Sequence, residues 1–288
     1  MAISNKTSKK SWISANYPVL LLIAVIIAVK LAFFFYDIQI IEQKKNISII
    51  EKAEELHETD QITALALYYY VLISETPISP KNYPRLFARI KNNMGECYYN
   101  LSEVKEKEKD LNLAITAYKE ALTIRTIKKY PDEFAETQYN LAYAYYELSQ
   151  VRDKETNIKH AITACEEVLK VYTPDRSPDY YSLTQNILGY AYYELSQVRD
   201  RETNLQLAIK AHVEGLKLTI TDNMSDYFAM NHYGIGLAYQ ELSLIQHNKA
   251  HLHLAIKAYE DALRIYNQND VPAEFIMVSL NEAKGMLR

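Results

Sequence analysis

The side chains best spaced for chemistry are three histidines near the carboxyl end of the chain. His247 and His251 are four residues apart, and His253 follows two residues later. Residues four apart lie on one face of a helix, where two imidazoles can share a cation such as Zn²⁺. Forty-seven residues earlier, the corresponding positions hold Asp200, Asn204 and Gln206. This equivalence favours a polar start to a helix, so the sequence predicts no metal site here.

Other catalytic signals are missing from the sequence. It contains no G-x-S-x-G, no G-x-x-x-x-G-K, no H-E-x-x-H and no Gly-rich turn after a strand. The two cysteines, Cys97 and Cys165, stand where other parts of the chain have Ala144 and Tyr118, which indicates core fillers. We therefore predict a protein that is not an enzyme, requires no cofactor and takes no small-molecule substrate.

Charge argues against one class of partner. The formal net charge is −4, and no stripe of lysine and arginine appears along the chain. Proteins that bind nucleic acid neutralise phosphates with clustered basic side chains. The sequence therefore predicts no nucleic-acid partner.

The chain repeats itself with a period of 47 residues. Residues 143–153 (YAYYELSQVRD) return unchanged as residues 190–200, and the same shift relates weaker matches in both directions. Four units are visible, at 84–130, 131–177, 178–224 and 225–271. A fixed period in this range means that each unit is one supersecondary element whose apolar face is covered only by its neighbours. The perfect identity exceeds what packing demands, and we attribute part of it to a recent duplication.

Each unit has the apolar spacing of two helices. In the third unit, apolar residues recur every three or four positions over residues 180–197 and 205–219, with a polar break at 199–202. Proline disrupts a helix interior, and prolines mark the joints between units at Pro131, Pro174, Pro178 and Pro272. The pattern predicts an array of helical hairpins.

Two further residue types refine this prediction. Asp200, and Asp153 one unit earlier, are placed to cap the free amides of the second helix. Gly189 and Gly236 recur in register inside the first helix, where glycine costs about 1 kcal/mol relative to alanine. We expect these glycines to mark close contacts between helices.

These residues resemble the tetratricopeptide repeat, whose signature runs L-G-x-x-Y, A-x-x-x-F and then P. The matching positions are Leu188, Gly189, Tyr192, Ala208, Ala255, Tyr259, Ala262 and Pro272. The resemblance covers residues 84–271 and implies a right-handed superhelical solenoid of helical hairpins. The units are longer than the usual 34 residues and lack the signature tryptophan. Helix-pair repeats of other families are the alternative.

The resemblance also implies a binding surface. In tetratricopeptide proteins the first helices line a concave groove that holds an extended peptide or a partner helix. The corresponding residues here are Asn92, Asn93, Glu96, Asn140, Tyr143, Glu147, Asn186, Tyr190, Glu194, Tyr233 and Glu241. This aromatic, acidic set suits a basic or amide-rich segment of a protein partner. Alternatively, Glu147, Glu194 and Glu241 pair with neighbouring repeats.

A membrane segment precedes the repeats. Residues 17–36 form an apolar run of 20 residues interrupted only by Lys30, and about 30 Å of helix matches the hydrocarbon core of a bilayer. A cleaved signal peptide is the alternative, but its apolar region is shorter, about 7 to 15 residues. The lysines before the run favour a cytoplasmic amino terminus, with the repeats on the opposite side of a membrane that the chain crosses once.

The predicted chain is therefore all-α, with a polar tail at 1–16, a transmembrane helix at 17–36, and a helical stalk with a partial capping repeat at 37–80. Four repeats follow at 81–271. A capping helix at 272–288 is marked by the apolar residues Phe275, Val278, Leu280 and Met286. We expect a membrane-anchored scaffold or adaptor that binds a protein partner through its concave surface. The alternative is a permanent structural subunit of a larger membrane complex.

Overall fold

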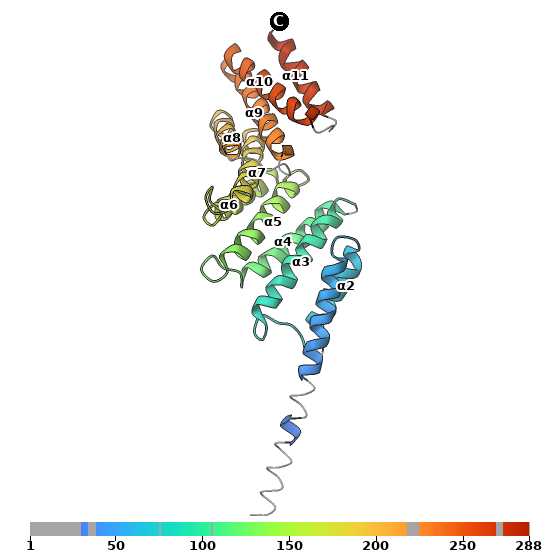
Figure 1. Ribbon diagram of the computed structural model, residues 1–288. Helices are drawn as coiled ribbons and strands as arrows, with labels where there is room; N and C mark the ends of the chain where they lie inside the picture. The colour runs from blue at the N-terminus through green and yellow to red at the C-terminus, as the bar shows by residue number, and fades with distance from the viewer. Residues whose placement is uncertain are drawn as a thin grey trace, which may run out of the picture.

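The computed structural model describes residues 30–33, 39–74, 76–104, 106–217, 225–268 and 273–287, which form helices joined by short turns. No strand occurs within these ranges, as predicted for an all-α chain. Figure 1 shows the helices following one another along an elongated array. After a helical stretch at 39–56, the helices are α2 (Gln61–Ile73), α3 (Pro84–Ser102), α4 (Lys107–Leu122), α5 (Pro131–Ser149), α6 (Lys154–Leu169), α7 (Pro178–Ser196), α8 (Arg201–Leu216), α9 (Ser225–Gln246), α10 (Lys249–Gln268) and α11 (Glu274–Leu287).

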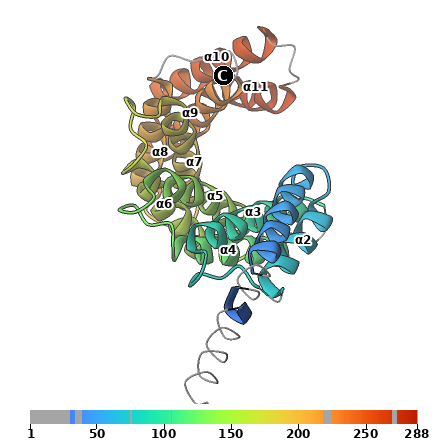
Figure 2. The same cartoon turned by 60° about the horizontal axis from the view of Figure 1, so that its bottom comes forward.

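The helices pair in the predicted way. The strongest contacts join α3 to α4, α5 to α6, α7 to α8 and α9 to α10, and the second helix of each pair packs against the first helix of the next. The pairs begin at Pro84, Pro131, Pro178 and Ser225, which are 47 residues apart. In Figure 2 the pairs form an arc, with α3, α5, α7 and α9 along its inner side. The prediction of stacked helical hairpins is confirmed.

The hairpin before the first pair packs onto α3. Ile50 and Ala53, from the stretch at 39–56, share one apolar cluster with Tyr68 of α2 and Met94 of α3. Asn46 is buried beside this cluster, where its amide donates to the carbonyl of Thr76 over 2.9 Å. This region therefore covers the first face of the array.

Close packing explains the glycines inside the first helices. A Cβ placed on Gly189 would lie 2.5 Å from the ring of His212, and one on Gly236 would lie 2.4 Å from the ring of Tyr259. Where the first helix carries Ala142 instead, the facing residue on the second helix is the smaller Cys165. The predicted close contacts between helices are confirmed, and side-chain sizes match across each contact.

The predicted aspartate caps are wrong in their mechanism. Asp153 and Asp200 do occupy the cap positions of α6 and α8, but neither side chain accepts a hydrogen bond from the helix amides. Both residues adopt left-handed backbone angles, with φ of 43° and 44°. The left-handed residue ends a short turn at 197–200, so α8 already begins at Arg201, inside the predicted polar break of 199–202.

The segment that occurs identically at 143–153 and 190–200 makes polar contacts with the neighbouring unit. Its glutamate meets a cation at the start of the preceding second helix, and its arginine meets a glutamate on that same helix. The first series pairs Lys107 with Glu147, Lys154 with Glu194, and Arg201 with Glu241. The second series joins Arg152 to Glu108, Arg199 to Glu155, and Gln246 to Glu202. These polar contacts between units explain why residues beyond the apolar core recur unchanged.

The two ends of the array differ. At the carboxyl end, α11 buries Ile276, Leu280 and Ala283, whereas Phe275 and Val278 are 45% and 57% exposed. One apolar side of α11 therefore faces the array and another faces outward.

At the amino end, most of the predicted membrane segment, residues 17–29 and 34–36, lies outside the described residues. Within the described ranges, no helix is both long and apolar enough to cross a bilayer.

Candidate interaction surface

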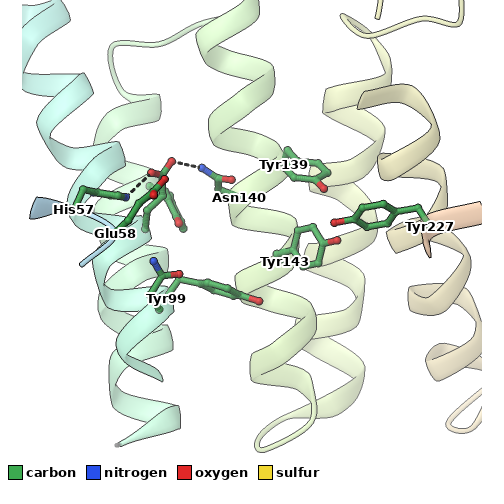
Figure 3. A pocket seen from close by; sticks show the side chains of 10 residues that line it. His57, Glu58, Tyr99, Tyr139, Asn140, Tyr143 and Tyr227 are labelled. Atoms are coloured by element: carbon green, nitrogen blue, oxygen red, sulfur yellow. Dashed lines mark hydrogen bonds and ion pairs between the residues drawn. The ribbon is translucent and has the colours of Figure 1, made fainter. Parts of the chain in front are cut away.

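The inner side of the arc contains a cavity of about 500 Å³. We call it the tyrosine pocket. It is assembled from the turn after residue 56, from α3 and α4, from α5, and from the start of α9. Its lining residues are His57, Glu58, Glu96, Tyr99, Asn100, Tyr118, Tyr139, Asn140, Tyr143 and Tyr227. Figure 3 shows how these side chains face a common space.

Glu96 is the polar centre of one wall. Its Oε1 accepts hydrogen bonds of 2.8 Å from both Asn92 and Asn140, and its Oε2 lies 3.0 Å from Nε2 of His57. These contacts join α3 to α5 and to the hairpin before the array. The carboxylate is held in place from three sides, so the wall is preorganised.

His57 carries a positive charge at neutral pH. The hydrogen bond to the thiol of Cys97, followed by that to Glu96, raises the pKa of His57 to about 10. Its ring therefore neutralises Glu96, while Glu58 adds a further carboxylate to the lining. The charged residues of the pocket sum to a net negative charge.

The opposite wall is aromatic. The rings of Tyr139 and Tyr143 meet edge to face, with centroids 5.1 Å apart. The hydroxyls of Tyr139, Tyr143 and Tyr227 point toward one another in Figure 3, although Tyr227 comes from α9, two pairs further along the chain. Burial raises the pKa of Tyr143 to about 12, so the phenol is neutral and offers a hydroxyl. This wall combines ring faces with polar tips.

A thiol, an imidazole and a carboxylate also lie in a row beside the pocket. Sγ of Cys97 is 3.4 Å from Nδ1 of His57, whose other nitrogen contacts Glu96. An imidazole next to a thiol can activate it as a nucleophile. Cys97 is fully buried, however, and does not line the pocket. The arrangement therefore fixes the position of His57 and does not present a sulfur atom to a ligand.

The structure brings together only part of the groove predicted from the family resemblance. Glu96, Asn140 and Tyr143 line the tyrosine pocket. Asn93 lines a smaller adjoining cavity of about 300 Å³, and its amide lies 3.2 Å from the hydroxyl of Tyr68. These residues form one continuous region at the first joint of the array.

The remaining predicted groove residues contact neighbouring units. Glu147, Glu194 and Glu241 make the ion pairs described above, as the alternative interpretation expected. Asn92 and Asn186 are buried, and the amide of Asn186 donates to Asn231 over 3.1 Å.

Two tyrosines in the predicted groove also pack against the next unit. The Tyr190 hydroxyl donates to the carbonyl of Met230 over 2.9 Å, and Tyr233 packs edge to face against Phe275. These side chains hold the array together.

Several lining residues escaped the sequence analysis. His57 and Glu58 precede the array, and Tyr227 comes from a unit distant in the chain, so the repeat pattern gave no reason to place them together. Tyr139 carried a usable signal, because it occupies the position of Asn92, Asn186 and Tyr233, which the predicted groove included.

The three histidines considered for metal binding have other surroundings. The ring of His251 packs on Tyr239 with centroids 5.6 Å apart, and His247 occupies the left-handed turn position, with φ of 50°. Within the described residues, no group of three or more His, Cys, Asp or Glu side chains is placed to hold a metal ion.

Comparison with known proteins agrees with the hairpin geometry. A family model described as tetratricopeptide repeat matches residues 95–126 and 237–269. These segments fall in the first and last of the four helix pairs, each covering the end of the first helix together with the second. No curated protein matches the chain. The two matched segments are therefore similar to tetratricopeptide repeats, and the four stacked helix pairs have a tetratricopeptide-like arrangement.

Proposed function

We propose that this protein is a scaffold that binds a segment of a partner protein on the inner side of its arc, next to a membrane. The tyrosine pocket is the observation that carries the proposal. Tetratricopeptide repeats indicate protein partners in general. A concave site with aromatic walls and a few fixed polar groups has the composition of a binding site.

The membrane part of the proposal rests on sequence. Residues 17–36 are long and apolar enough to form a single transmembrane helix, and only a short stretch separates them from the first packed hairpin. Anchoring confines the scaffold and its partner to one surface, and confinement can raise avidity by about 10² to 10⁴ without new contacts. The lysine distribution favours a cytoplasmic amino terminus.

A photo-crosslinking amino acid tests where the partner binds. We would place it at Tyr227 or Asn100, in the pocket, and at Thr116 or Thr163, which are exposed on α4 and α6. The proposal expects one partner to crosslink from the two pocket positions and not from the two control positions. Equal crosslinking from all four positions would contradict an inner binding face.

A companion experiment tests the anchor. The intact chain is expected to stay in the membrane fraction during alkaline extraction. The variant that lacks residues 17–36 is expected to be released into the supernatant. Protease protection in sealed vesicles then reports on which side the repeats lie. Retention of the deleted form on membranes would contradict anchoring by this segment.

One observation favours the alternative of a permanent subunit. The outer side of α11 exposes Met277 and Val278, at 53% and 57%, beside Phe275. Apolar side chains gathered on a surface often mark an interface. A complex that survives changes in the pocket but dissociates when Met277 and Val278 become serine would support this alternative.

A further inference from the structure

The tyrosine pocket combines features that suit a positive charge. Two carboxylates line it against one protonated imidazole, so the charged groups leave a net negative charge. Tyr99, Tyr139, Tyr143 and Tyr227 supply ring faces and hydroxyl oxygens around the same space. An anion such as a terminal carboxylate would meet repulsion here, whereas a cation would be attracted.

The two carboxylates have different tasks. Glu96 already accepts three polar contacts from the protein, so it shapes the wall. Glu58 is exposed, and its carboxylate has no ion-pair partner among the residues that the structure describes. Its neighbours in the same hairpin differ, since Glu54 pairs with Arg89 and Glu55 with Lys52. Glu58 is therefore the pocket carboxylate that remains available to a ligand.

The tyrosine rings complement this charge. A lysine or arginine side chain is attracted to the face of a tyrosine ring when its charge lies within about 6 Å of the ring centre. Its N–H groups also need acceptors, and neutral phenol oxygens together with a carboxylate provide them. The hydroxyls of Tyr139, Tyr143 and Tyr227 converge on one side of the pocket (Figure 3). A cation in the pocket would thus meet ring faces and phenol oxygens on one wall and the wall that carries Glu58 on the other (Figure 3).

We propose that the tyrosine pocket binds a lysine or arginine side chain from a basic segment of the partner protein, with Glu58 as its counter-ion. This inference rests on the proposed function, in which the inner face of the arc binds a protein. A choline headgroup of a lipid also carries a quaternary cation, but its phosphate would lie beside the carboxylates. The observations therefore favour a peptide side chain.

The test uses the full chain in a maltoside detergent, which carries no cationic headgroup that could compete. Peptides that bind the protein are selected from a random library, and each is made again with citrulline in place of arginine or norleucine in place of lysine. Citrulline keeps the length of the arginine side chain, norleucine keeps the four-carbon stem of lysine, and both replacements remove the charge. Dissociation constants are then measured by fluorescence anisotropy.

We expect the selected peptides to be rich in lysine or arginine and to bind at least about tenfold more weakly after replacement, which corresponds to 1.4 kcal/mol. Glu58→Gln should weaken binding by about five- to tenfold, within the range of a charge-assisted hydrogen bond. Glu51→Gln is the matched control, because it removes the same charge from an exposed position outside the pocket. Tyr227→Leu should weaken binding more than Tyr227→Phe, which keeps the ring.

Three other outcomes would overturn the inference. If uncharged peptides bind and are lost with Tyr227→Leu but not with Glu58→Gln, the inner face binds a protein without a basic anchor, and the proposed function survives. If no selected peptide responds to any pocket variant, the proposed function fails as well. If phosphocholine displaces the peptides while the citrulline and norleucine forms bind unchanged, the pocket holds a lipid headgroup.

Discussion

Replacing Gly189 by alanine should destabilise the array, although alanine is the better helix former. The added Cβ would lie 2.5 Å from Cε1 of His212, where ordinary contacts of this kind are 3.4–4 Å. The ring cannot retreat, because on its other side the distance from Nε2 to a Cβ built on Gly234 is only 2.2 Å. Either the ring or a helix must move by about 1 Å.

The magnitude follows from two opposing effects. Overpacking of a core costs typically about 1 to 3 kcal/mol, and we expect the upper end because backbone flanks the ring on both sides. Alanine regains about 1 kcal/mol of helix propensity. The net loss should be about 2 kcal/mol. Gly285→Ala is the matched control, since nothing lies within 4 Å of its Cβ position, and it should gain about 0.5 to 1 kcal/mol.

The chain itself suggests a compensating change. At the previous joint, Ala142, Cys165 and Ile187 occupy the positions of Gly189, His212 and Gly234 and share one apolar cluster. The triple variant Gly189→Ala, His212→Cys, Gly234→Ile copies that joint and should recover most of the lost stability. Omitting Gly234→Ile should leave a cavity and recover less.

Urea unfolding of the full chain in detergent, followed by far-ultraviolet circular dichroism, measures each variant. Repeat arrays can unfold in steps. For each variant, the change in unfolding free energy should therefore be taken from the transition that this variant shifts. An increase in stability for Gly189→Ala equal to that for Gly285→Ala would refute the argument from close packing.

Three further outcomes are expected from the polar contacts. Lys154→Glu should lower the free energy of unfolding by about 0.5 to 1 kcal/mol, because it breaks the ion pair with Glu194. Adding Glu194→Lys should restore the lost stability in a double-mutant cycle measured by urea unfolding. Losses that simply add in the double variant would contradict the ion pair. Burial lowers the pKa of His212 to about 4, so its contribution to stability should be present above about pH 6.5 and be lost as the pH falls toward 4. In thermal unfolding, His212→Gln should make the melting temperature depend less on pH across this range. The pKa of His57 is raised to about 10, so its contribution should be complete below about pH 6.5 and be lost as the pH rises through 10; an unchanged alkaline profile in His57→Gln would contradict this.

The periodic part of the fold could be predicted from the sequence because each unit meets nearly the same neighbours. Apolar spacing gave the helices, proline gave the starts of α5 and α7, and recurrent glycine gave the close contacts. The sequence also contained a stronger signal. Gly189 and Gly236 precede His212 and Tyr259 by 23 residues, and Ala142 precedes Cys165 by the same interval, so size compensation was visible before the structure.

The pocket could not be predicted in this way, because it depends on where the periodicity ends. His57 and Glu58 lie in the turn of the hairpin before the four matched units, where the residue pattern of the repeats is no longer recognisable. Tyr227, from the start of α9, faces Tyr139 and Tyr143 of α5 across two helix pairs of the curved array (Figure 3). The spacing of residues within one unit contains no information about this curvature. The set of groove residues predicted from the family resemblance therefore includes both residues that line the pocket and residues that join the units.

One position of the repeat shows how a single residue type serves both roles. Tyr143 and Tyr190 occupy equivalent places in α5 and α7, inside the identical segments. The hydroxyl of Tyr190 donates to the carbonyl of Met230 and its ring meets His212 edge to face, so this tyrosine contacts the neighbouring helices. The hydroxyl of Tyr143 instead faces the cavity with Tyr139 and Tyr227. The same tyrosine of the repeat therefore joins two units at one position of the array and lines the tyrosine pocket at another.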